Sequence, residues 1–382
     1  MKDSKFVPGK TKILYGGVAF GKEERKAIEK VLDKNWWGLA KESAKFEQEL
    51  ALVLGVKQAI FVNSGSSALD LGIRAASLPK GAEVIVPACT FPTPVASLIR
   101  AGLTPVVVDI EEGTNFIDLV SFSKSISQKT AAVLLVYVAG NVGNLDQILQ
   151  IARDHKLLVF EDNCDGFGGL WKGRMLGSFG TFSAISTHAA HIISTGQGGV
   201  VCTDNKLLAD QIISLRDWGR IHSFETPYHR YTYDSLGSNY NPLELQAAMG
   251  RVQLKKLTLF KKIRLRNWRL LYQGLDDLRD QLILPKVYPQ ADPCWYTFTI
   301  VLKKAERKAL TEYLDKKQIE WRPILAGNIA RQPGFKDKVI SRTALNHADQ
   351  VFEQGLWLPI HPLWSVEAME YIVKTIHHFF RR

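Results

Sequence analysis

The segment AIFVNSGSSALDLGIRAA, residues 59–76, decides the fold of this 382-residue chain. It opens with an apolar run, Ala59–Val62, whose Ile, Phe and Val are typical of a buried strand. The run stops at Ser64–Gly65, and from Ser66 onward the apolar residues recur at helical spacing. Because strand, short turn and helix form the repeating unit of a parallel sheet, the segment predicts an α/β fold.

The same alternation continues over the first two thirds of the chain. Further strands are predicted at Glu83–Val86, Pro105–Ile110, Ala132–Val138, Leu157–Glu161 and Gly199–Thr203. Helices are predicted at Lys22–Asn35, Ser43–Leu54, Ser66–Ala76, Pro94–Ala101, Leu145–His155 and Lys206–Arg216. Strands of this composition, separated by helices, indicate mainly parallel pairing with helices on both faces. Ligands of such sheets gather at the carboxyl ends of the strands.

The pattern changes near residue 290. Strands are predicted at Thr297–Leu302, Ile319–Pro323 and Leu356–Pro359, and helices at Glu306–Lys317 and Ser365–Phe380. A long helical region, Pro242–Gln273, leads into this part. We therefore expect a large domain over residues 1–265 and a smaller α+β domain over residues 266–382.

The chain is basic, with 49 Lys and Arg against 38 Asp and Glu and a net charge of +11. This balance favours an anionic partner. The densest basic stretch, KKLTLFKKIRLRNWR at residues 255–269, has the spacing of an amphipathic helix. Its basic face is either solvated, a wall against a diphosphate, or a nucleic-acid surface. No helix-turn-helix, zinc-finger or RNP-type signature supports the last, so no nucleic-acid partner is expected.

The sequence also bears on compartment and metal content. No apolar run reaches the length that spans a bilayer, and the start, MKDSKFVPGK, lacks the apolar core of a signal peptide. The four cysteines form no C-x-x-C pair, so neither a zinc site nor a disulfide framework is expected. These features predict a cytoplasmic protein with no membrane partner.

Three motifs at strand ends are suited to a flat, phosphorylated cofactor. A helix that starts after Ser64–Gly65–Ser66 presents free N–H groups to a phosphate, although serine is also a common helix cap. Asp162 ends the apolar run LLVFED and can pair with a protonated ring nitrogen, or it can cap a turn. Phe91, in ACTFPTPV, can stack on a ring or pack in the core.

A fourth motif, STHAAHIISTGQGG at residues 186–199, holds two histidines. An imidazole such as that of His191 can move a proton, although a lone histidine is more often a structural hydrogen-bonding group. His188 competes with it for any catalytic role. No lysine lies between Lys172 and Lys206.

Together the motifs resemble the DegT/DnrJ/EryC1/StrS sugar aminotransferases, of pyridoxal-phosphate fold-type I. The resemblance covers roughly residues 15–380 and includes NSGSSAL, the ED pair, GRMLGSFGTFS, GQGGVVCTDN and LGSNYNPLELQAAMGRVQLKKL. Within the family the chain is most similar to the lysine-less sugar 3-dehydratases. Their likeness is carried by LRDWGR, YTYDSLGSNYN, ILAGNIARQPGF and a histidine, here His191, at the position of the usual lysine.

The resemblance implies a role for each matching residue. His191 would be the base. The cofactor would be bound by Ser64, Gly65 and Ser66 at its phosphate, Ser186 beside them, Phe91 on the ring, Asp162 at the ring nitrogen, Asp165 near the ring oxygen, and Asn239 from a neighbouring subunit. Substrate or cosubstrate would be bound by Arg331, His188 and Arg220.

The chain departs from the family pattern at three places. Asp165 stands where the family usually has Gln or His, Gln197 replaces a common Glu, and His191 is followed by Ile192 rather than a second histidine. One dehydratase subgroup also carries a cysteine cluster for an iron–sulfur centre. Residues 221–233 contain no cysteine, so no iron–sulfur cluster is expected.

The implied activity is removal of the C3 hydroxyl of a nucleotide-linked 4-keto-6-deoxy sugar by a homodimer that binds pyridoxamine phosphate without a covalent link. An amino donor such as glutamate would restore the amine form of the cofactor. Two alternatives stay open: a nucleotide-sugar aminotransferase, and a catalytically inactive, cofactor-binding regulatory protein.

Overall fold

The computed structural model describes residues 6–221 and 231–381. Two sequence-based arguments therefore lie partly outside the described residues: the start of the chain, residues 1–5, and most of the cysteine-free stretch at 221–233.

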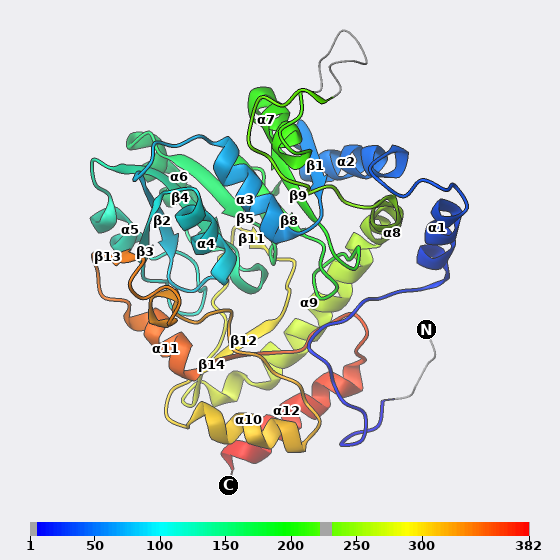
Figure 1. Ribbon diagram of the computed structural model, residues 1–382. Helices are drawn as coiled ribbons and strands as arrows, with labels where there is room; N and C mark the ends of the chain where they lie inside the picture. Colours follow the sequence, from blue (N-terminus) through cyan, green and yellow to red (C-terminus); the bar gives the residue numbers. More distant parts are fainter. Residues whose placement is uncertain (1–5, 222–230, 382) are drawn as a thin grey trace.

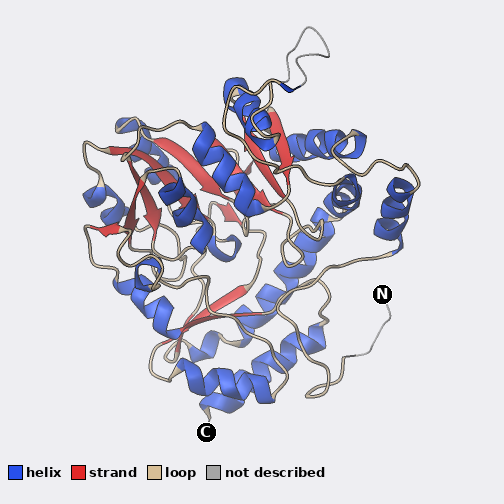
Figure 2. Cartoon of the chain, viewed as in Figure 1, coloured by secondary structure: helices blue, strands red, loops and turns tan. Residues whose placement is uncertain are grey.

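Within these ranges the largest element is a mainly parallel sheet of eight strands (Figures 1 and 2). Its order is β1 (Gln58–Val62), β9 (Gly199–Thr203), β8 (Phe182–Ser186), β5 (Leu158–Asp162), β4 (Thr130–Val136), β2 (Glu83–Pro87), β3 (Thr104–Val108) and β13 (Ile340–Ser341). The α/β fold and the predicted strands of the first two thirds are confirmed. The structure adds β8, which the sequence pattern did not indicate.

The sheet is mainly parallel, as predicted, and the exception is β9, which runs antiparallel to both β1 and β8. The reason lies in the connection, because residues 187–198 contain no helix that could carry the chain back to the opposite edge of the sheet. Residues 187–198 instead form a turn that reverses the direction of the chain, and several of these residues line the cavity at the edge of the sheet.

Helices cover both faces of the sheet because alternate strand residues point to opposite sides. One face packs against α3 (Gly65–Ala75), α4 (Pro92–Arg100) and α7 (Lys206–Arg216). The other packs against α2 (Lys41–Leu54), α5 (Leu119–Ser125), α6 (Leu145–Asp154) and α8 (Glu244–Lys255), and α1 (Lys22–Leu32) contacts α8. Helix α3 lies so close that a Cβ on Gly72 would be 2.3 Å from the ring of Phe182.

The C-terminal part has its own core around an antiparallel sheet. The sheet has the order β10 (Leu282–Ile283), β12 (Phe298–Leu302) and β14 (Gly355–Leu358). Its helices are α9 (Leu257–Gly274), α10 (Arg307–Lys316), α11 (Asn346–Gln354) and α12 (Val366–Phe380). A third small sheet consists of β11 (Ala291–Asp292), β6 (Leu170–Trp171) and β7 (Arg174–Met175). The strand predicted at Ile319–Pro323 is wrong: these residues form only isolated bridges, and Pro323 has no N–H to donate.

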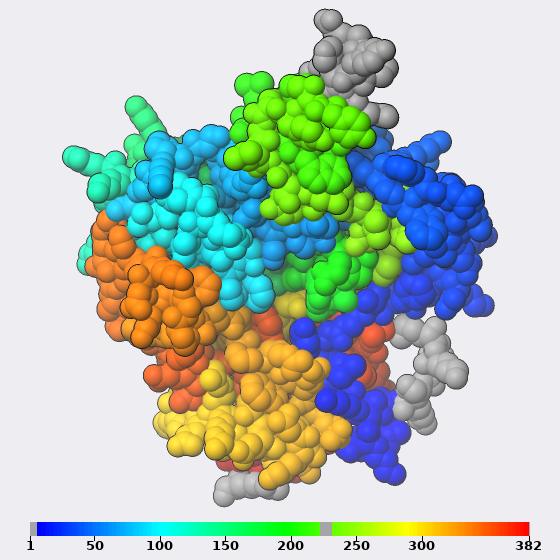
Figure 3. All heavy atoms as spheres, viewed as in Figure 1, coloured from blue at the N-terminus to red at the C-terminus, as the bar shows by residue number. Residues whose placement is uncertain are grey.

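The two parts are joined by more than one segment. Helix α9 runs across the predicted boundary at residue 265, and β13 of the C-terminal part pairs with β3 of the large sheet. At the other end of the chain, Ile13 pairs with Ile319 and packs in the C-terminal core. Figure 3 shows this N-terminal segment, in blue, lying against the C-terminal part. No helix among the described residues combines the length and the hydropathy needed to cross a bilayer.

Candidate active site

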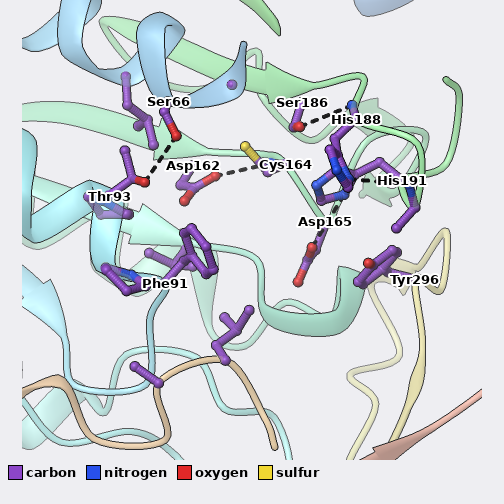
Figure 4. Close-up of a pocket in the computed structure, with 18 of the residues that line it drawn as sticks. Ser66, Phe91, Thr93, Asp162, Cys164, Asp165, Ser186, His188, His191 and Tyr296 are labelled. Atoms are coloured by element: carbon purple, nitrogen blue, oxygen red, sulfur yellow. Dashed lines mark hydrogen bonds and ion pairs between the residues drawn. The ribbon is translucent and has the colours of Figure 1, made fainter. Parts of the chain in front are cut away.

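A cavity of about 650 Å³ opens at the carboxyl edge of the large sheet (Figure 4). The turns after β1, β2, β5 and β8 meet there because parallel strands end at a common edge. Nine of the residues expected to form the site line this cavity: Ser64, Gly65, Ser66, Phe91, Asp162, Asp165, Ser186, His188 and His191.

The turn after β1 is built to accept an oxyanion. Ser64 caps α3, and its Oγ accepts a hydrogen bond from the N–H of Ser67 at 3.0 Å. A Cβ on Gly65 would lie 2.7 Å from the Cβ of Ser186, so this turn and the end of β8 are in contact. Ser66 Oγ lies 3.1 Å from Thr93 Oγ1. The helix N-terminus and the hydroxyls of Ser66 and Ser186 therefore offer donors suited to a phosphate.

Asp162 ends β5 as a buried carboxylate with few partners. Its Oδ1 accepts a hydrogen bond from the N–H of Cys164 at 3.1 Å, and no ion pair with it is found among the described residues. Burial raises the pKa of its carboxyl group, and the contact with Cys164 partly offsets this. A carboxylate in this setting gains from a cationic N–H donor, which a protonated pyridine ring provides.

Phe91 closes this side of the cavity. It precedes α4, which starts at Pro92, and 53% of its surface is exposed. An exposed aromatic ring on a cavity wall can stack on a flat ligand. We call the Ser64–Ser66 turn together with Ser186 the phosphate cradle. The cradle, the Asp162 carboxylate and the Phe91 ring together fit a pyridoxal-type cofactor.

His191 lies on the opposite wall, and its imidazole is unprotonated at neutral pH. Burial lowers its pKa to about 3, and the charges of His188 and Arg264 act in the same direction. Its Nδ1 has no hydrogen-bond partner among the described residues, and its ring stacks on Tyr296 with centroids 5.0 Å apart. An unprotonated imidazole beside a cofactor cleft can accept a proton.

Asp165 faces His191 at the base of the cavity. Its Oδ1 is 3.6 Å from Nδ1 of His191, and its Oδ2 accepts a hydrogen bond from the N–H of Ala139 at 3.1 Å. Burial and the nearby Asp162 raise the pKa of Asp165 to about 7, while the Ala139 contact and Arg264 lower it. Near neutral pH this carboxyl group can therefore carry a charge that would stabilise a protonated His191.

Three expected site residues do not line the cavity. Arg331 donates two hydrogen bonds to Asp349, Nε to Oδ1 at 2.7 Å and Nη2 to Oδ2 at 2.6 Å. Arg220 pairs with Asp217 at 3.4 Å, and the exposed Asn239 accepts a bond from Asn63 through its backbone oxygen. The GNIARQP motif does reach the cavity, but through Gln332, next to Arg331.

Sequence reasoning missed the part of the wall that comes from distant segments. Tyr15 comes from the N-terminal segment, and Tyr296, Arg322 and Trp357 come from the C-terminal part. No local pattern marks these residues, because only the folded chain brings residue 15 next to residue 322. In the described residues no group of three or more His, Cys, Asp or Glu side chains is arranged to hold a metal ion.

Two known proteins are similar to this chain over most of its length. A dTDP-4-dehydro-2,6-dideoxy-D-glucose 3-dehydratase from Saccharopolyspora spinosa is 34% identical over 98% of this chain and 88% of its own length. A GDP-perosamine synthase from Escherichia coli O157:H7 is 29% identical over 94% of this chain and 96% of its own length.

Among solved structures, a GDP-4-keto-6-deoxymannose-3-dehydratase with a trapped PLP–glutamate geminal diamine superimposes with a TM-score of 0.91. It is 27% identical and covers 95% of this chain and 99% of the solved chain. A family model matches residues 19–377, which include the large sheet, most of the C-terminal part and every residue that lines the cavity except Tyr15. The chain therefore belongs to the DegT/DnrJ/EryC1/StrS aminotransferase family.

Proposed function

We propose that the protein is a pyridoxamine-phosphate-dependent 3-dehydratase of a nucleotide-linked 4-keto-6-deoxy sugar. The observation that carries the proposal is His191, an unprotonated imidazole on the cavity wall opposite Asp162, at the position that resembles the family's lysine site. No lysine is among the described residues that line the cavity. Both the dehydratase relative and the dehydratase structure support this assignment.

Each part of the cofactor would have its own partners in the cavity. The Ser64–Ser66 turn and Ser186 would hold the phosphate, Asp162 would hold the ring nitrogen in its protonated form, and Phe91 would stack on the ring. When bound, pyridoxamine phosphate supplies an amine that links to the sugar's keto group and a ring that withdraws electrons.

The chain's own residues then move the proton. His191 would accept the proton at the carbon that bears the amine, and the Asp165 carboxylate would stabilise the imidazolium that forms. The hydroxyl at C3 of the sugar would then leave as water by taking the proton from His191. His188, which is exposed and lines the cavity, would contact the sugar.

We propose glutamate as the amino donor that restores the amine form, a choice supported by the glutamate bound in the dehydratase structure. We also propose a cytoplasmic homodimer. Asn239 is exposed and lies outside the cavity of its own chain, so it is available to the cavity of a second copy. Sedimentation of the fully active protein as a monomer would contradict the dimer.

A product-mass experiment tests the activity. The protein is incubated with pyridoxamine phosphate, glutamate and a panel of GDP- and dTDP-linked 4-keto-6-deoxy sugars, and a deoxy-ketosugar is expected. His191→Asn should lower the rate about 10²–10⁴-fold. His155→Asn, at an exposed position after α6, is the matched control and should leave the rate unchanged. If His191→Asn dehydrates the substrate at the wild-type rate, His191 is not the base.

The covalent state of the cofactor is tested separately. After incubation with pyridoxal phosphate and reduction with borohydride, the intact mass should show no stable lysine adduct. An adduct in good yield would contradict the lysine-free mechanism.

A nucleotide-sugar aminotransferase is the second candidate, and the similarity to a GDP-perosamine synthase favours it. The product mass separates the two, because an amino sugar in place of the deoxy-ketosugar identifies the aminotransferase. Cofactor binding without turnover of any substrate in the panel would instead identify an inactive homologue, in line with the unusual Asp165 and Gln197.

A further inference from the structure

Arg264 is a cation buried in an unusual place. It lies on the inner face of α9 with 1% of its surface exposed, although the stretch around it is strongly basic and solvated. Its Nη1 donates to the backbone oxygen of Tyr296 at 2.7 Å and lies 3.5 Å from that of Trp295. Among the described residues its Nε and Nη2 have no hydrogen-bond partner and no carboxylate forms an ion pair with it, although the charge of Asp165 acts on it from a longer distance.

Such an arrangement costs stability. A buried guanidinium without a carboxylate partner loses hydration that two carbonyl oxygens restore only in part. An apolar side chain of similar length would fill the same space without this cost. Positions that break local rules at a cost to stability are typically functional ones.

The contacts of Arg264 lead directly to the candidate base. The Tyr296 ring is near both: its centroid is 5.9 Å from the guanidinium carbon of Arg264 and 5.0 Å from the centroid of the His191 ring, which it meets at 29°. One turn along α9, Trp268 stacks on Trp295 with centroids 4.4 Å apart. Helix α9 therefore holds Trp295 and Tyr296, which precede β12, in place. Because the Tyr296 ring stacks on His191, the helix also restrains the plane of the imidazole.

We propose that Arg264 is a positioning residue for His191: its hydrogen bond to the backbone oxygen of Tyr296 fixes the ring on which the imidazole stacks, and so sets the orientation of the imidazole. Asp165, 3.6 Å away on the other side, then supplies the opposite charge once the proton has arrived. The positioning of His191 by Arg264 does not depend on the proposed function, whereas the reaction in which His191 acts as a base does.

The charged and titratable groups around His191 come from several elements, and each enters the pH dependence. Those that face His191, or the Tyr296 ring against it, are Asp162 and Asp165 after β5, His188 on the same loop, Arg264 on α9, Tyr296 itself, Tyr15 and Arg322. The positive charge of Arg264 lowers the pKa of His191, so its removal should raise that pKa.

The primary test uses nuclear magnetic resonance of the cofactor-free protein labelled with ¹⁵N-histidine, in which the His191 signal is identified by its loss in His191→Asn. In Arg264→Met the ring signal should shift and the pKa of His191 should rise. In Arg269→Met, which removes an exposed cation from the same helix, neither should change. An identical His191 titration in wild type and Arg264→Met would overturn the proposal.

Kinetics give the second readout. Arg264→Met should lower kcat about 100-fold with KM within two-fold, because the base is misplaced while the binding groups are untouched. Arg264→Lys keeps the charge but loses the planar guanidinium, so it should leave the His191 pKa low and still reduce kcat more than ten-fold. If Arg264→Met does not fold, wild-type kcat in Arg264→Lys would overturn the proposal. If no sugar nucleotide is dehydrated, the proposed function fails, while the His191 titration still decides the role of Arg264.

Discussion

Replacement of Asp165 by asparagine should change how stability depends on pH. The folded chain holds the pKa of this carboxyl group at about 7, against an ordinary value of 3.8. Between these values the folded state retains a proton that the unfolded state has lost, so stability present at low pH is lost as the pH rises. The loss is about 1.4 kcal/mol for each pH unit, or about 4 kcal/mol between pH 4 and pH 7 as an upper bound. The asparagine side chain of the variant does not titrate, and its amide oxygen can still accept the Ala139 N–H.

The assay is urea unfolding of the cofactor-free protein, followed by tryptophan fluorescence at pH 5, 6, 7 and 8. Asp165→Asn should gain stability over wild type as the pH rises, and the difference should level off above pH 7. Asp337→Asn, at an exposed carboxylate, is the control and should follow wild type at every pH. A constant difference between Asp165→Asn and wild type from pH 5 to pH 8 would refute the reasoning, because Asp165 would then be ionised throughout.

Two glycines give further predictions. Gly65→Ala places a Cβ 2.7 Å from that of Ser186 and should separate the two halves of the phosphate cradle. Its affinity for pyridoxal phosphate should fall about ten-fold or more, measured by fluorescence titration, whereas Gly334→Ala, with open space around the new Cβ, should bind normally. Gly72→Ala gains about 1 kcal/mol of helix propensity but forces a Cβ within 2.3 Å of the Phe182 ring, which costs roughly 1–3 kcal/mol. A lower melting temperature is expected, and a higher one would show that the helix–sheet contact can relax.

The part of the site that could be predicted from sequence is the part that lies on one sheet edge. Ser64 and Asp162 lie after and at the ends of predicted strands, so the strand assignment already brings them to one edge. Ser186 and His191 lie at the end of β8 and after it, and because the sequence pattern did not indicate that strand, their place in the site followed only from the family resemblance. The direction of β9 could not be derived from its composition, because an apolar strand reads the same in either direction. It depends on the missing crossover helix between residues 187 and 198.

The rest of the candidate site depends on contacts between segments that are distant in the sequence. Tyr296 faces His191 only because α9 and β12 pack beside the large sheet, which no local pattern encodes. Arg264 is an intermediate case: it falls at helical spacing between the buried Phe260 and Trp268. The sequence therefore indicates that Arg264 lies on the apolar face of a helix. The many other basic residues in the same stretch make this single arginine hard to distinguish from those on the solvated face.

The N-terminal segment supplies a part of the cavity wall, Tyr15, whose partner is synthesised late. The Tyr15 N–H donates to Glu320 at 2.9 Å, a contact between residues 305 positions apart. At typical synthesis rates of about 5–20 residues per second, the two partners leave the ribosome roughly 15–60 s apart. The turns at the carboxyl edge of the sheet can therefore form on the growing chain well before Tyr15 has a partner. The order of synthesis lets the sheet edge form first and the wall beside it close last.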